Sequence, residues 1–159
     1  MKRAVRIGSL MFVAAAVLAS FSCGSNPAAK VEDSQVSTLG AIEVTAQLAE
    51  IPEGAIFKRD LYNYATILKY KVLQVHRGEL AGAVIYVGHY NPWKPRSEAP
   101  DRRVKNTGGN LRRFHAGQAH RLALEAPIDD YYMGGIVNRY FGQDTGPLYW
   151  AVWTNLAGE

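Results

Sequence analysis

The sequence that decides the fold runs from residue 64 to residue 90 and reads YATILKYKVLQV (64–75), HRGELAG (76–82) and AVIYVGHY (83–90). The first and last segments are rich in β-branched and aromatic residues, which suit a half-buried pleated surface. The middle segment contains Gly78 and Gly82, where a chain can reverse its direction. This pattern predicts two long antiparallel strands in a small all-β domain.

The hydrophobic pattern changes phase inside the first of these strands. Positions 64, 66, 68, 70 and 72 share one face, whereas the next apolar residues are Leu73 and Val75. Such a change indicates a β-bulge or a sharp bend, which is how strands curl into barrels.

Three further segments complete the expected sheet. Residues 40–50 and 120–126 alternate between apolar and polar side chains, and the last expected strand covers residues 148–154. An alternating pattern is typical of a strand with one buried face. Residues 128–141 are ambiguous, because Asp129 and Asp130 suit the cap of a short helix that Gly134 and Gly135 then weaken.

The N-terminus has the features of an export signal. Lys2, Arg3 and Arg6 precede an uncharged, mostly apolar run over residues 10–19. A bilayer-spanning helix needs about 20 apolar residues, so this run is too short to be one. We therefore expect residues 1–22 to be a signal peptide.

Cys23 is the only cysteine of the chain and follows the apolar run directly. An exported protein with one cysteine cannot form an internal disulfide, so the thiol is free, paired between chains or modified. The site resembles the lipobox of bacterial lipoproteins: Ser22 fits it, whereas Ser20 stands where leucine is usual. The resemblance implies a lipid on Cys23 and, from Gly24, sorting to the outer membrane. The alternative is ordinary signal cleavage after Ser22.

The composition after the signal peptide separates a tether from a domain. Residues 23–38 are poor in large apolar groups and predict a lipid-anchored flexible tether, followed by a β-barrel domain over residues 39–157. Without Lys2, Arg3 and Arg6, 15 basic residues face 14 acidic ones. This balance argues against a nucleic-acid partner, which requires broad neutralisation of phosphates.

The order of these elements is similar to that of netrin-like modules, the OB-type barrels of tissue inhibitors of metalloproteinases. The resemblance spans residues 41–125 and rests on a pattern of hydrophobic residues and glycines. That pattern comprises Tyr70, Val72, Val75, Arg77 and Gly78, then Ile85 and Val87, then Gly108, Gly109, Asn110 and Leu111, and finally Gly117, Leu122 and Leu124. It implies a five-stranded OB-like barrel with a long basic loop between strands 3 and 4.

Two features depart from that family. Vertebrate members carry disulfides in the barrel, and this domain contains no cysteine. The inhibitors chelate a protease metal through the free amine of an N-terminal cysteine, whereas Cys23 lies ahead of the domain and its amine would be acylated. Protease inhibition is therefore not expected, and fold alone does not define function.

The loop over residues 91–117 concentrates positive charge. A loop of this length in a compact domain is usually functional or disordered. An aromatic side chain beside several cations suits recognition of partner proteins, peptides or anionic polysaccharides. The candidate ligand-binding residues are Trp93, Arg96, Arg102, Arg103, Lys105, Arg112 and Arg113. Seven aromatic residues lie between positions 131 and 153, and about half of them should fill the barrel.

The alternative function is a hydrolase or transferase of the cell envelope. His120 with Asp129 or Asp130 is the best raw material for general acid–base catalysis. His76, His89, His115 and His120 show no metal-ligand spacing, so neither a metal nor another cofactor is expected. No nucleophile elbow or phosphate loop is present. We therefore expect a non-enzymatic envelope lipoprotein, facing the periplasm or the exterior, that binds an envelope protein, a peptide or an anionic glycan.

Overall fold

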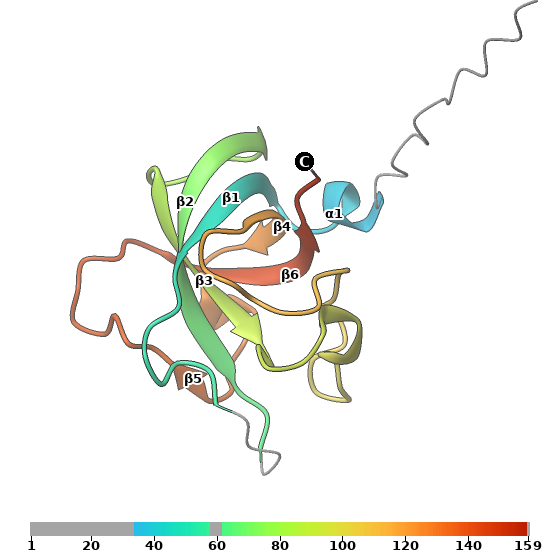
Figure 1. Ribbon diagram of the computed structural model, residues 1–159, viewed down its shortest axis with the longest axis vertical. Coiled ribbons are helices and arrows are strands. Elements are labelled where there is room, and N and C mark those ends of the chain that lie inside the picture. The colour runs from blue at the N-terminus through green and yellow to red at the C-terminus, as the bar shows by residue number, and fades with distance from the viewer. Residues whose placement is uncertain (1–33, 58–61, 159) are drawn as a thin grey trace, which may run out of the picture. The chain divides into compact units, whose positions relative to one another are not determined.

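The computed structural model describes residues 34–57 and 62–158, and the predicted signal peptide and lipid site lie outside these ranges. The described chain is almost entirely β-structure (Figure 1). Its elements are α1 (Ser34–Thr38), β1 (Ile42–Glu50), β2 (Ala65–Arg77), β3 (Val84–Tyr90), η1 (Arg96–Glu98), β4 (Ala119–Glu125), η2 (Ile128–Asp130), β5 (Ile136–Val137) and β6 (Leu148–Leu156). Among the described residues, no helix is long and apolar enough to cross a membrane.

Five of the strands close into a barrel. The strand order is β1-β4-β6-β3-β2, and β1 also pairs with β2, which closes the ring. The β3–β6 contact is parallel, whereas the other pairings around the ring are antiparallel. This confirms the predicted all-β, OB-like barrel, with the long loop between β3 and β4. One extra two-residue strand, β5, pairs in parallel with the start of β2.

The predicted bend lies in β2. Thr45 pairs with Gln74 and Ala46 pairs with Val72, so Leu73 is the extra residue of a bulge. Bulges of this kind increase the local twist of a strand. The bend turns the end of β2 across β1. It does not bury the apolar side chains at this end of β2, since Leu73 is 54% exposed.

The strands bury side chains on both faces. Inside the barrel, Val44, Leu68, Val87, Leu122 and their neighbours form one core. Alternate residues of these strands form a second core outside the barrel wall, together with side chains from α1, η2 and the loop residues after η2. That second core includes Val36, Ala65, Ile67, Ala123, Ile128, Tyr132, Tyr140, Trp150 and Val152. Residues of α1, η2 and the loops cover this outer face. As a result, neither β4 nor β6 has a face that is fully exposed to solvent.

The segment just before the expected domain boundary at Leu39 packs on the barrel. Residues 34–38, which the sequence assigned to the tether, form α1, and its Val36 is 1% exposed. The Arg77 guanidinium donates hydrogen bonds to the carbonyl oxygens of Ser37, Leu39 and Gly40. Burial of Val36 and these bonds fasten α1 and the following turn to the barrel.

Candidate functional site

The loop between β3 and β4 has an outgoing half, residues 91–106, and a returning half, residues 107–118. The outgoing half contains Arg96, whose side chain is 1% exposed. Its guanidinium donates to the carbonyl oxygens of Tyr90 at 2.7 Å, Asn91 at 2.5 Å and Lys94 at 3.1 Å. Burial lowers the pKa of Arg96 to about 10. The side chain therefore holds the loop together, and we no longer assign it to a ligand-binding surface.

Trp93 is also part of this internal structure. Its ring is partly buried and stacks on Tyr64, with 4.5 Å between ring centroids. The Lys94 ammonium lies 5.9 Å from the centroid of the Trp93 ring. Trp93 thus packs the base of the loop and presents little free ring to a ligand.

The remaining basic residues of the outgoing half are exposed but do not form one site. Arg102 and Lys105 line neither of two surface pockets, of about 470 and 340 Å³. Arg103 lines the smaller pocket, of about 340 Å³, together with Tyr131 and Met133. Of the seven C-terminal aromatic residues, Tyr131 and Phe141 are exposed, Trp153 is half-buried and the others are buried.

The returning half is fixed against the end of β6. The Gly108 amide donates to the Val152 carbonyl at 3.0 Å, and the Thr154 amide donates to the Gly108 carbonyl at 2.9 Å. A Cβ on Gly109 would lie 1.9 Å from the Thr154 carbonyl oxygen, so only glycine permits this approach. The Asn110 side chain then accepts a hydrogen bond from the Leu156 amide at 2.9 Å.

Of the next four residues, the first and the last point into the barrel and the middle two face the solvent. Leu111 and Phe114 are buried in the inner core, whereas Arg112 and Arg113 are exposed. Two apolar side chains therefore fasten the segment, and the two cations between them stay at its surface. Neither guanidinium makes a hydrogen bond or ion pair with a side chain of the described ranges.

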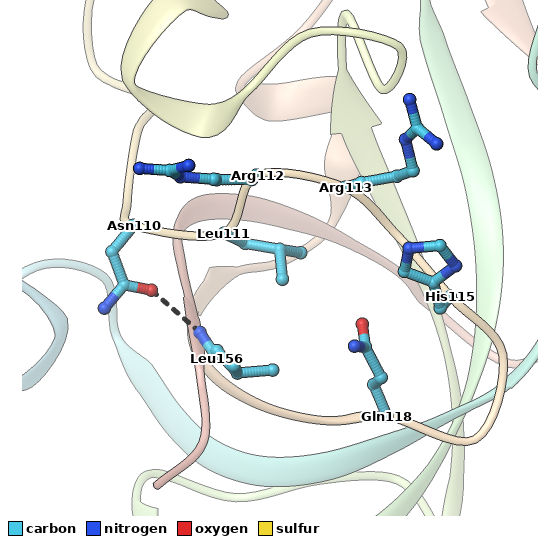
Figure 2. Close-up of a pocket in the computed structure, with 7 residues that line it drawn as sticks. All are labelled: Asn110, Leu111, Arg112, Arg113, His115, Gln118 and Leu156. Carbon is cyan, nitrogen blue, oxygen red and sulfur yellow. Dashed lines mark hydrogen bonds between the residues drawn. The ribbon is translucent and has the colours of Figure 1, made fainter.

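These residues border an open pocket of about 470 Å³ (Figure 2). Its lining residues are Asn110, Leu111, Arg112, Arg113, His115, Gln118 and Leu156. No acidic side chain is among the described residues that line it, so the pocket has a positive rim. Figure 2 shows Gln118 and Leu156 on the side opposite the two arginines, with Leu111 directed between them. The volume lies in the range of small-ligand sites.

A polar cluster that the sequence did not reveal lies inside the barrel. Tyr70 Oη is 3.1 Å from both His89 Nε2 and His120 Nδ1, and all three side chains are fully buried. Since one hydroxyl donates a single hydrogen bond, it donates to one imidazole and accepts from the other. The sequence signal for this cluster was that His120 alternates in phase with the apolar residues Leu122 and Leu124, which predicts a side chain on the buried face of the strand.

Burial keeps these histidines neutral. It lowers the pKa of His120 to about 4. It also lowers the pKa of His89 well below its usual value, with smaller contributions from the positive charge of Arg96 and from the neighbouring imidazole of His120. The pKa of Tyr70 is raised well above its usual value, again mainly by burial. The cluster therefore belongs to the packed core at neutral pH.

The structure does not bring together the residues of the alternative enzymatic hypothesis. His120 is the second residue of β4 and is fully buried, with Tyr70 as its hydrogen-bond partner. Asp129 and Asp130 follow the other end of β4 and are exposed. These three side chains share no cleft, so the arrangement offers no acid–base pair at a surface site.

Within the described ranges, no three His, Cys, Asp or Glu side chains are grouped so as to hold a metal ion. No family model, curated protein or solved structure matches this chain.

Proposed function

We propose that this protein is a non-enzymatic lipoprotein of the bacterial cell envelope that binds an anionic ligand in the pocket beside Arg112 and Arg113. The observation that carries the proposal is the pair of exposed guanidinium groups, which have no side-chain partner among residues 34–57 and 62–158, on a pocket that these residues line without an acidic side chain. Arginine guanidinium groups bind carboxylates and phosphates through paired hydrogen bonds. The pocket therefore suits an acidic group on a peptide, an envelope protein or a glycan.

The rigidity of the pocket supports this function. Leu111 and Phe114 fix the arginine segment from below, and the hydrogen bonds of Gly108 and Asn110 fix it to β6. A binding group that is already in position loses less conformational entropy when the ligand arrives. The segment is thus a better binding surface than a freely moving basic loop.

The location of the protein is proposed from its first residues. A lipid on Cys23 would anchor the chain to the envelope, with the outer membrane favoured by Gly24, and the domain would face the periplasm or the exterior. Mass spectrometry of the protein purified from membranes should find an acylated Cys23 as the first residue. Recovery of a Cys23→Ser variant in the membrane fraction at wild-type yield would contradict the anchor. The resemblance to netrin-like modules remains part of this proposal.

Two matched double variants test the pocket. Arg112→Ala/Arg113→Ala removes two charges from it, and Arg102→Ala/Lys105→Ala removes two charges from exposed positions elsewhere on the same loop. Full-length protein in detergent would be applied to two resins, one carrying polygalacturonate and one carrying peptides coupled through their amino ends. On at least one resin, the wild type and the control variant should be retained and the pocket variant should elute early.

The salt dependence distinguishes a site from general charge attraction. Exposed charges that do not form a site are screened within about 10 Å at 0.1 M salt. The difference between the two double variants should therefore persist at this ionic strength. Equal losses of retention in both variants on both resins would contradict the proposed function.

A further inference from the structure

The pocket contains an unused hydrogen-bond acceptor as well as two cations. Gln118 Oε1 is buried and has no hydrogen-bond partner among the described residues. Gln118 belongs to the pocket lining, and its side-chain amide is directed into the space below the arginines (Figure 2). Buried polar atoms are nearly always paired, so an unpaired acceptor beside a pocket is a candidate partner for a donor on a ligand. A ligand with an N–H or O–H group would supply it.

The same pocket has an apolar side. Leu156 is 50% exposed, and Leu111 lies next to it at the base of the pocket. Leu156 pairs with His120 across the β6–β4 ladder. Because directly opposed residues point to the same face of a sheet, Leu156 projects from the barrel end rather than from its outer wall. This side of the pocket suits an aliphatic group.

The lining residues also argue against a sugar ligand. Among the described lining residues there is no phenylalanine, tyrosine or tryptophan ring. Sugar rings are commonly bound by stacking on such side chains, which offer a large apolar face with a polar edge. An acid with a hydrogen-bond donor and an aliphatic group therefore fits the pocket better than an acidic polysaccharide.

From these three features we propose that the pocket binds the carboxyl terminus of a peptide chain whose last residue is small and aliphatic. This inference rests on the proposed anion-binding function and names its ligand class. The terminal carboxylate would bind one of the two guanidinium groups, because the side chains of Arg112 and Arg113 extend to different sides of the pocket rim (Figure 2). The amide N–H of the last residue would donate to Gln118 Oε1, and its side chain would contact Leu111 and Leu156.

The compactness of the pocket favours a chain terminus over an internal acidic residue. In the last residue of a peptide, the carboxylate, the N–H and the side chain are all attached to one Cα atom. An internal aspartate or glutamate uses its side chain for the acid, which leaves no aliphatic group on that residue for the leucines. A single C-terminal residue can therefore satisfy all three parts of a pocket of about 470 Å³.

The test uses two hexapeptides with an N-terminal fluorescein and the sequence Gly-Ser-Gly-Ser-Ala-Val, one with a free carboxylate and one with a C-terminal amide. Binding to the full-length protein in detergent is measured by fluorescence anisotropy. The free acid should bind at least about tenfold more tightly than the amide, because the amide lacks the charge that guanidinium groups recognise. Arg112→Ala/Arg113→Ala should remove this preference, and Arg102→Ala/Lys105→Ala should preserve it.

A second pair of variants examines the amide acceptor. Gln118→Met keeps the side-chain length and removes the acceptor, so it should weaken binding of the free acid by about threefold to tenfold. Gln143→Met is the matched control, because Gln143 is exposed and lies outside the pocket lining. Urea denaturation of each variant would verify that the fold is intact before its affinity is compared.

The outcomes separate the ligand class from the function. Equal binding of acid and amide, or unchanged affinity of Gln118→Met, would overturn the peptide-terminus proposal. Retention on polygalacturonate that depends on Arg112 and Arg113, without binding of the free-acid peptide, would also overturn it and leave the anion-binding function in place. Retention on neither resin would overturn both.

Discussion

The two halves of the loop between β3 and β4 contain the same residue type in opposite roles. In the outgoing half, Arg96 is buried and bonded to three carbonyl oxygens. In the returning half, Arg112 is exposed at the rim of a pocket. The surroundings of each side chain explain the difference in burial. Three carbonyl groups converge on Arg96, whereas the buried neighbours Leu111 and Phe114 hold Arg112 at the surface. Net charge along a loop therefore does not identify which cations can meet a ligand.

Replacing the two arginines separately should give the largest contrast. Arg96→Ala leaves the carbonyls of Tyr90, Asn91 and Lys94 without their donor and removes the cation that lies 5.2 Å from the Phe114 ring centroid. We expect a loss of about 3–5 kcal/mol in the free energy of unfolding. Arg112→Ala, at an exposed position, should change it by less than about 0.5 kcal/mol.

Urea denaturation of full-length protein in detergent measures both values. Similar losses for the two variants would mean that Arg96 contributes no more to folding than a surface arginine. Arg96→Lys serves as a second comparison, since lysine keeps the charge but cannot present the planar set of donors that three carbonyls require. It should recover only part of the lost stability.

The second contrast lies between the two buried histidines, His89 and His120, and the exposed His115, and pH reveals it. His120 has a pKa of about 4 in the folded protein and about 6.5 when unfolded. The unfolded chain therefore binds protons first as pH falls below 6.5, and the folded state loses stability down to pH 4. The loss due to His120 should reach about 3 kcal/mol at pH 4. His89, whose pKa is also lowered, adds to the loss in the same direction.

Urea denaturation between pH 7 and pH 4.5 measures this effect. Above pH 4.5 the carboxyl of Asp101 contributes little to the change, because its hydrogen bonds lower its pKa to about 2. His120→Gln removes one titrating group and should flatten the pH dependence. His115→Gln, at an exposed position of the pocket, should leave the dependence at its wild-type slope. A slope that is the same in all three proteins would exclude His120 as its source.

Much of the architecture could be predicted from the sequence, because strand periodicity is a local signal. Alternation at residues 42–48 and the phase change at Val72 led to the correct strands and to the bulge. The burial of the outer faces of β4 and β6 was not predictable in this way. It depends on Val36, Tyr132 and Tyr140, which come from segments without a clear period and reach the barrel only after folding.

The sequence and the structure single out the same loop, but the sequence does not sort its cations. The charge density over residues 94–113 indicated the loop that borders the proposed pocket, yet no sequence pattern separates an arginine that caps carbonyls from one that faces solvent. The separating information is long-range. It lies in the contact of Gly108 and Gly109 with β6, whose residues are more than 40 positions further along the chain. The inward turn of Leu111 and Phe114 follows from that contact.

The glycines of the returning half provide the third and smallest contrast. Gly109 has a φ of 130°, and an added Cβ would lie 1.9 Å from the backbone oxygen of Thr154. Gly117 has a φ of 90°, but an added Cβ would have no atom within 4 Å. Both substitutions strain the backbone by about 1 kcal/mol, and only Gly109→Ala also pushes the loop away from β6. Its total cost should be about 2 kcal/mol.

Gly109→Ala should also weaken ligand binding in the pocket, more specifically than it weakens the fold. Displacement of residue 109 moves Asn110 and the arginines away from Leu156, so Gly109→Ala should lose affinity for an acidic ligand even under conditions where the protein is fully folded. Gly117→Ala should keep that affinity, because nothing obstructs the added methyl group. Parallel measurements of urea denaturation and resin retention test this expectation. Wild-type retention by Gly109→Ala would show that the position of the arginines does not depend on the contact between the loop and β6, and that a merely basic segment is sufficient for binding.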